Sequence, residues 1–229
     1  MKRFYKDVAV SEDRGILLDG RPVKTPARAA LLLPNDALAN AVAEEWRAQG
    51  EEIDPRSMPF TGLANAAIDR VAANPNAFAA GLAQYGETEL LCYRAERPPE
   101  LIARQTERWD PLLDWAKTQY DVDFVQVAGI MHQPQPMTTL LRLGDAIAAA
   151  NPFALAALSP IVTIGGSLVL ALGVYEEAVL PHDAFDLAHL DELWQAELWG
   201  EDDFALATRA AHRRDFIAAC QFLELLRAA

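Results

Sequence analysis

Residues 182–189 contain three side chains with the types and spacing of metal ligands. His182 and Asp186 are four residues apart, and Asp186 and His189 are three apart, so on a helix all three would share one face. Imidazole and carboxylate groups bind zinc or iron, which would make the chain a metal-dependent enzyme. No second cluster clearly supplies further ligands, and Asp183 after Pro181 suits a helix N-cap. A capping aspartate with two ordinary surface histidines is therefore favoured, and the metal-dependent enzyme is the alternative.

Nucleophilic chemistry is less well supported. Cys92 lies among apolar neighbours, and neither it nor His132 has a partner that the sequence identifies. The run Gly165-Gly166-Ser167 lacks the spacing and the lysine of a phosphate-binding loop, and it is not a G-x-S-x-G elbow. We therefore expect no enzyme and no cofactor. Cys92 and Cys220 fit neither a disulfide framework nor a paired zinc motif, which favours a reducing compartment.

Charge excludes some classes of partner. The 229 residues include 20 basic and 33 acidic side chains, for a net charge of −13, so nucleic-acid binding and polybasic membrane attachment are not expected. Residues 143–208 contain eleven acids and neither Lys nor Arg. Two interpretations stay open: a solvated helical surface, or an interaction surface for a basic or amphipathic partner.

The stretch 153–175 has no charged side chain and is long enough for a helix that spans a membrane. Pro160 and the pair Gly165-Gly166 interrupt it, and basic flanking residues are absent. Two consecutive buried helices are the favoured interpretation, without membrane insertion. The basic residues near Met1 are not followed by an apolar segment, so a secretory signal is not expected either.

The secondary structure that positions these side chains is predicted to change along the chain, from strands to helices. Residues 1–34 alternate like strands around Asp19-Gly20, a strong hairpin signal. A helix is expected after a cap at Asn35 or Asp36, followed by a proline-containing connector and then by helical periodicity to the end. The predicted fold class is therefore α+β multidomain. Residues 1–58 form a small all-β N-terminal domain (strands to about 34, then a helix and connector), and residues 59–229 form a larger all-α domain.

Residues 190–203 form a predicted helical segment with an unusual distribution of tryptophans and acids. Leu187, Leu190, Trp194 and Leu198 would share one helix face, whereas Trp199 falls on another. Two tryptophans on different faces of the helix indicate that one packs in the core and that the other contacts a different surface. Acids follow Gly200 directly, where they oppose the helix dipole unless a new helix begins there.

A series of motifs runs through nearly the whole chain in a specific order. They are Arg3-Phe4-Tyr5-Lys6, Leu18-Asp19-Gly20-Arg21-Pro22-Val23-Lys24-Thr25-Pro26, Glu45-Trp46 with Gln49, Met58-Pro59 with Thr61, Asp69, Thr88-Glu89-Leu90-Leu91-Cys92-Tyr93-Arg94-Ala95, Arg104-Gln105 with Trp109-Asp110-Pro111, Gly166-Ser167-Leu168, and Asp191-Glu192-Leu193-Trp194-Gln195 with Glu197 and Trp199-Gly200-Glu201-Asp202. In this order they resemble one known family, the assembly chaperones for the α subunit of the F-type ATP synthase in mitochondria and alphaproteobacteria. Glu89 departs from the aspartate of many members.

The resemblance implies a small β domain before a helical one, no cofactor and no catalysis. It implies a bacterial, cytoplasmic chaperone that holds the free ATP synthase α subunit until β subunits pair with it, and we expect this chaperone to be a monomer. A general protein-interaction adaptor is a further alternative. As the partner-binding surface we predict Glu192, Glu197, Trp199 and Asp202, with the tryptophan as apolar anchor and the acids attracting basic groups.

Overall fold

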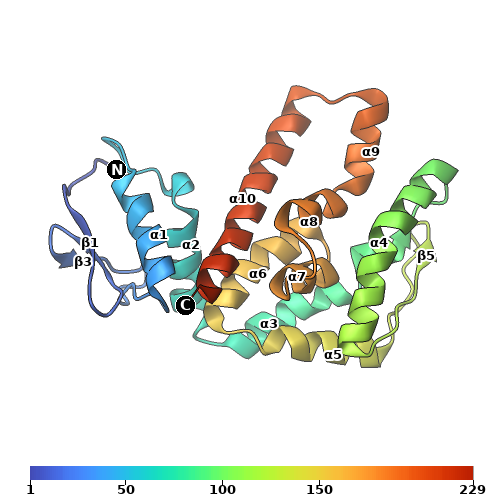
Figure 1. Ribbon diagram of the computed structural model, residues 1–229, viewed down its shortest axis with the longest axis horizontal. Helices are drawn as coiled ribbons and strands as arrows, with labels where there is room; N and C mark the ends of the chain where they lie inside the picture. The colour runs from blue at the N-terminus through green and yellow to red at the C-terminus, as the bar shows by residue number, and fades with distance from the viewer. Residues whose placement is uncertain (229) are drawn as a thin grey trace. The chain divides into compact units, whose positions relative to one another are not determined.

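The computed structural model describes residues 1–228 and is mostly helical, with 62% helix and 8% strand (Figure 1). It contains two compact units, each built from segments that are separate in the sequence. Unit 1 consists of residues 1–75, 151–157 and the described part of 218–229, and unit 2 of residues 76–150 and 158–217. The boundary that the sequence places after residue 58 stays a prediction.

Unit 1 contains a small antiparallel sheet in the order β1-β2-β3, with β1 at Val8–Val10, β2 at Ile16–Leu18 and β3 at Arg21–Pro22. Asp19 and Gly20 connect β2 to β3 with φ angles of 48° and 76°. Glycine and aspartate tolerate positive φ better than most residues, which is why this pair makes the turn. The hairpin predicted at Asp19-Gly20 is confirmed.

Helices supply the rest of unit 1. The side chain of Asn35 caps α1 (Asp36–Arg47) by accepting the N–H of Leu38 at 2.9 Å. A 3₁₀ turn at Pro55–Ser57 precedes α2 (Pro59–Ala66), which continues into a π-helical turn at Ala67–Val71. The ring of Phe222 from the C-terminal segment lies 6.5 Å from Phe153 and 6.3 Å from Phe60.

The expected all-β N-terminal domain is therefore wrong. The strands are two or three residues long, and beyond them the segment makes only isolated bridges, such as Gly15 with Leu32. So short a sheet buries little apolar surface by itself. Its partner is α1, whose buried face consists of Leu38, Ala39, Val42 and Ala43.

Unit 2 is helical around α7 (Leu168–Tyr175), in which the first seven residues are buried. The remaining elements are α3 (Pro75–Ala83), 3₁₀ turns at Gln84–Gly86 and Leu90–Cys92, α4 (Pro99–Tyr120), α5 (Met137–Ala148), α6 (Pro152–Gly165), α8 (Pro181–Ala188), α9 (Leu190–Trp199), α10 (Asp203–Arg227), and a short parallel pair of β4 (Tyr93–Arg94) and β5 (Val127–Ala128). Helices α6 and α10 each contribute residues to both units.

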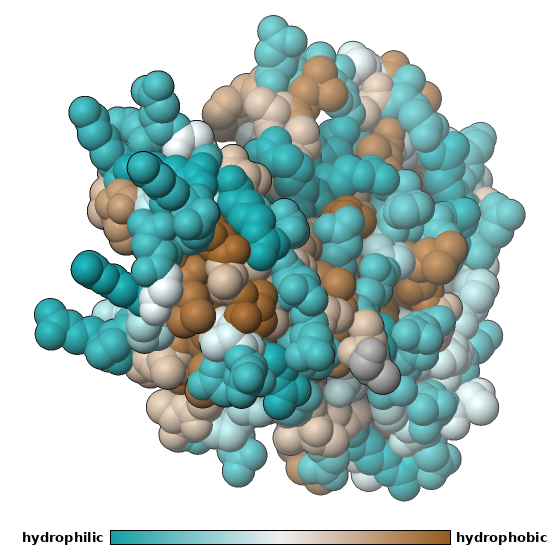
Figure 2. Space-filling view, turned by 60° about the vertical axis from the view of Figure 1, so that its left-hand side comes forward, coloured by the Kyte–Doolittle hydropathy of each residue, from teal (hydrophilic) through white to brown (hydrophobic). Residues whose placement is uncertain are grey.

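The apolar stretch 153–175 is two helices, as expected, because Gly166 takes a φ of 65° and Ser167 caps α7 by accepting the N–H of Leu170 at 2.9 Å. Within residues 1–228, no helix is both long and apolar enough to cross a bilayer. The face drawn in Figure 2 is largely hydrophilic and is interrupted by hydrophobic patches.

Candidate functional site

Helices α9 and α10 are joined by a short turn, and the start of α10 runs beside α9 (Figure 1). Gly200, with a φ of 76°, ends α9. The carboxylate of Asp202 then accepts the N–H of Ala205 at 2.8 Å and caps α10, and Asp203 lies in its first turn. Acids at this position favour the new helix, because its N-terminus carries partial positive charge. The acids after Gly200 thus have a structural reason to be there.

All four predicted partner-binding residues lie in this hairpin. Glu192 and Glu197 project from α9, Trp199 is the last residue of α9, and Asp202 is the cap of α10. All four side chains are exposed, and Trp199 is 78% exposed. The structure brings these residues together; that they bind a partner stays a prediction.

The turn exposes more apolar surface than the sequence indicated. Phe204 is 82% exposed and Leu198 54% exposed, and Leu206 is exposed as well. We call the set Leu198, Trp199, Phe204 and Leu206 the apolar tip. Helical periodicity alone did not indicate that Leu198 is exposed. Phe204 was missed, although an aromatic residue directly after Asp202-Asp203 was a usable signal.

Helix α4 supports α9 through buried polar contacts. The side chain of Gln105 is fully buried, donates to the carboxylate of Asp191 at 2.8 Å and accepts the N–H of Ala95 at 2.8 Å. The indole N–H of Trp109, also buried, donates to the carbonyl of Leu187 at 3.0 Å. Because buried polar groups are costly to leave unpaired, the bond to Asp191 holds α9, and the bond to Leu187 holds α8 directly before it.

Ion pairs surround the base of the tip. One guanidinium nitrogen of Arg104 lies 2.8 Å from both carboxylate oxygens of Glu197, and the same guanidinium stacks over the ring of Trp194 at 4.4 Å. Arg209 of α10 pairs with Glu201 and lies 3.8 Å from Glu192. The negative charges of Glu192 and Glu197 are thus partly compensated.

The sequence's candidate metal ligands do not converge. His182 is exposed, and Asp186 pairs with Arg213 at 2.8 Å. His189 is buried at the end of α8, stacks on Phe185 at 4.0 Å, and has a pKa lowered by burial. Across residues 1–228, no group of three or more His, Cys, Asp or Glu side chains is arranged to hold a metal ion.

The two thiols are also poorly placed for chemistry. Cys92 and Cys220 are buried, and burial raises the pKa of each to about 12, with the nearby carboxylates of Glu89 and Glu224 adding to the respective shifts. Since the thiolate is the nucleophile, both side chains stay protonated near neutral pH and behave as small apolar residues.

Comparison with known proteins places these features in a family. Residues 2–117 match the model described as ATP12 chaperone protein. The crystal structure of Atp12 from Paracoccus denitrificans is 41% identical with a TM-score of 0.92, covering 99% of this chain and 98% of that chain. A candidate chaperone from Agrobacterium tumefaciens is 43% identical, also with a TM-score of 0.92, covering 99% of this chain and 86% of that chain.

Proposed function

Because the chain belongs to the ATP12 chaperone protein family, we propose that it binds the free α subunit of the F-type ATP synthase in the cytoplasm and keeps it from aggregating until β subunits pair with it. The family membership gives a chaperone and hence a protein client. The resemblance in sequence motifs is what points to the α subunit, and the apolar tip is the feature that supports a binding role.

The apolar tip carries the proposal. Two aromatic rings, Trp199 and Phe204, project into solvent from either side of one short turn, next to the exposed Leu198 and Leu206. Folded proteins seldom leave a group of large apolar side chains uncovered unless it contacts a partner. Aromatic residues also supply the largest contact area per side chain at protein interfaces.

Charge around the tip suits a client and disfavours self-association. The protein carries a net charge of −13, and residues 143–208 contribute acids without any Lys or Arg. Two copies therefore repel each other, whereas a client with basic groups beside its apolar surface is attracted. The carboxylate of Asp202, which forms no ion pair within residues 1–228, and the exposed carboxylates of Glu192 and Glu197 would meet those basic groups.

The test is an aggregation assay on isolated α subunit, followed by light scattering. The wild-type protein should suppress aggregation, and the double variant Trp199→Ser/Phe204→Ser should suppress it at least about tenfold less efficiently. Phe4→Ser is the matched control, because Phe4 is similarly exposed but lies in unit 1. Equal protection by the double variant and the wild type would refute the placement of the client surface.

The same assay separates the α-subunit chaperone from a general adaptor. Isolated β subunit and an unrelated aggregating protein serve as comparison clients. The proposal expects protection of the α subunit at concentrations that leave both comparison clients unprotected. Similar protection of all three would favour the adaptor instead.

A further inference from the structure

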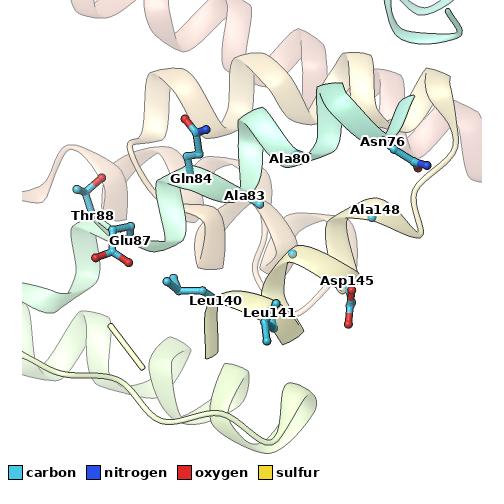
Figure 3. A pocket seen from close by; sticks show the side chains of 11 residues that line it. Asn76, Ala80, Ala83, Gln84, Glu87, Thr88, Leu140, Leu141, Asp145 and Ala148 are labelled. Atoms are coloured by element: carbon cyan, nitrogen blue, oxygen red, sulfur yellow. The ribbon is translucent and has the colours of Figure 1, made fainter. Parts of the chain in front are cut away.

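A second apolar surface lies in unit 2, between α3 and α5, in a cavity of about 560 Å³ (Figure 3). Ala80 and Ala83 of α3 face α5, with Glu87 and Thr88 near one end. Gly144 on α5 has no side chain, and a Cβ atom there would meet only that of Ala83, at 3.8 Å. Small side chains on both walls leave a groove into which larger side chains of another molecule can fit.

Exposed apolar residues continue from the groove along α5 and into the loop before it. Met137 is 68% exposed, and Leu141, one helical turn later, is exposed as well. Ile130 is 94% exposed, and Met131 beside it is exposed too. His132, next in the chain, has its Nε2 atom 3.3 Å from a carboxylate oxygen of Glu87, so this loop is tied to one end of the groove.

The charge of the groove indicates what it would bind. Its only charged lining residues are Glu87 and Asp145, both acidic. Arg142, the one basic residue of α5, is directed elsewhere, since it bonds to the backbone and the carboxylate of Asp121. A second copy of this chain would bring another net charge of −13 and be repelled. A partner with basic side chains beside an apolar stripe is complementary.

We propose that the α3–α5 groove is a second docking site, which binds an amphipathic helix of the protein client with an apolar stripe flanked by Lys or Arg. This inference rests on the proposed function for the identity of the client. A helix suits the groove because its own backbone hydrogen bonds are satisfied, so that it can bind through side chains alone. The wall formed by α5 is 12 residues long, which matches an occupant of about three helical turns.

Binding is tested with a labelled synthetic peptide of about four helical turns, with a Leu/Ala stripe flanked by lysines, and with a matched peptide that has glutamates in their place. Fluorescence anisotropy follows each peptide with the full-length protein. Ala80→Trp fills the groove at an exposed helix position, and Asp145→Lys reverses an exposed charge. Glu176→Lys is the charge-matched control, at an exposed site outside the groove.

The wild-type protein should bind the lysine peptide at least about tenfold more tightly than the glutamate peptide. Ala80→Trp should weaken binding at least about tenfold and Asp145→Lys about fivefold, whereas Glu176→Lys should leave it unchanged. Urea unfolding checks that each variant is folded. Equal affinity for both peptides, or undiminished binding by folded Ala80→Trp, would overturn the proposed groove.

The client assay distinguishes the two proposals. Ala80→Trp should protect the isolated α subunit less well than the wild type, although its apolar tip is intact. If Ala80→Trp loses the peptide but protects the subunit normally, the groove is not a client site, and the tip proposal stands. If the wild-type protein itself gives no protection, the proposed function fails, and the client cannot be the groove's occupant.

Discussion

Reversal of one charge at the base of the tip should separate client binding from folding. In the Glu197→Lys variant, the pair between Glu197 and Arg104, with 2.8 Å between the charged atoms, is replaced by two neighbouring cations. The side chains are 57% and 36% exposed, so the pair contributes about 0.5–1 kcal/mol, and the new repulsion costs a similar amount. Together these losses amount to about 1–2 kcal/mol, so the melting temperature should fall by about 2–8 °C.

Client capture by Glu197→Lys should fall by about five- to tenfold at low salt, because the new lysine repels basic groups of the client. The small loss of stability does not explain a decrease of that size. The double variant Arg104→Glu/Glu197→Lys restores the ion pair with opposite polarity. It should recover the melting temperature while capture stays weak, since the outward carboxylate of α9 is still absent. Both quantities are measured on the same samples, by thermal unfolding and by α-subunit aggregation.

Two results would refute this reasoning. Normal capture by Glu197→Lys alone would mean that the client does not meet this part of α9. Full recovery of capture in the charge-swapped double variant would mean that Glu197 only holds Arg104 against Trp194 and does not face the client.

Two further predictions concern stability. Trp109→Ala should lower the free energy of unfolding by about 3–5 kcal/mol, measured in urea, because Trp109 is fully buried. Trp199→Ala is the same substitution at an exposed site and should change that free energy by less than about 0.5 kcal/mol. Burial raises the pKa of Glu89 to about 7. Between about pH 4.5 and 7, the folded state therefore holds a proton that the unfolded state has released. The free energy of unfolding should consequently fall by up to about 3 kcal/mol as pH rises through that window. In Glu89→Gln that fall should be absent; an unchanged pH profile in urea unfolding would show that Glu89 is ionised throughout.

Local signals in the sequence were sufficient where a few adjacent residues determine the structure. Asp19-Gly20 makes the hairpin turn, the amide of Asn35 begins α1, and the pair Gly165-Gly166 separates α6 from α7, whereas Pro160 lies inside α6. Each depends on backbone conformation or on a cap within a few residues. That is why the pattern predicted them correctly.

Which segments of the chain make up unit 1 depends on contacts between residues far apart in the sequence, and local sequence patterns do not predict such contacts. Phe222 is more than sixty residues from Phe153 in the sequence, yet their rings stack 6.5 Å apart, with Phe60 on the same aromatic cluster. The side-chain amide of Asn35 likewise donates to the carbonyl of Leu225 at 2.9 Å. An all-β N-terminal domain was wrong because the three short strands are covered by a helix, α1, and by side chains of the segment after it, such as Ile53 and Met58.

The candidate site was predicted in part. Trp199 was identified because it falls off the buried face of α9, and the structure does leave it exposed. Leu198 was grouped on one helix face with Leu187, Leu190 and Trp194, because helical periodicity treats a helix as uniform along its whole length. It lies instead in the last turn before Gly200, where the hairpin reverses and its side chain is 54% exposed.

The two proposed surfaces together suggest how a chaperone can hold a client and still release it. A single contact strong enough to prevent aggregation would also delay transfer to the subunit's true partner. The apolar tip and the α3–α5 groove lie at different ends of unit 2 (Figure 1), and each is modest in size. Two weak contacts on one client give high avidity while both are engaged, and that avidity is lost when either is displaced. A β subunit that covers one contact region on the α subunit would therefore be enough to release the other.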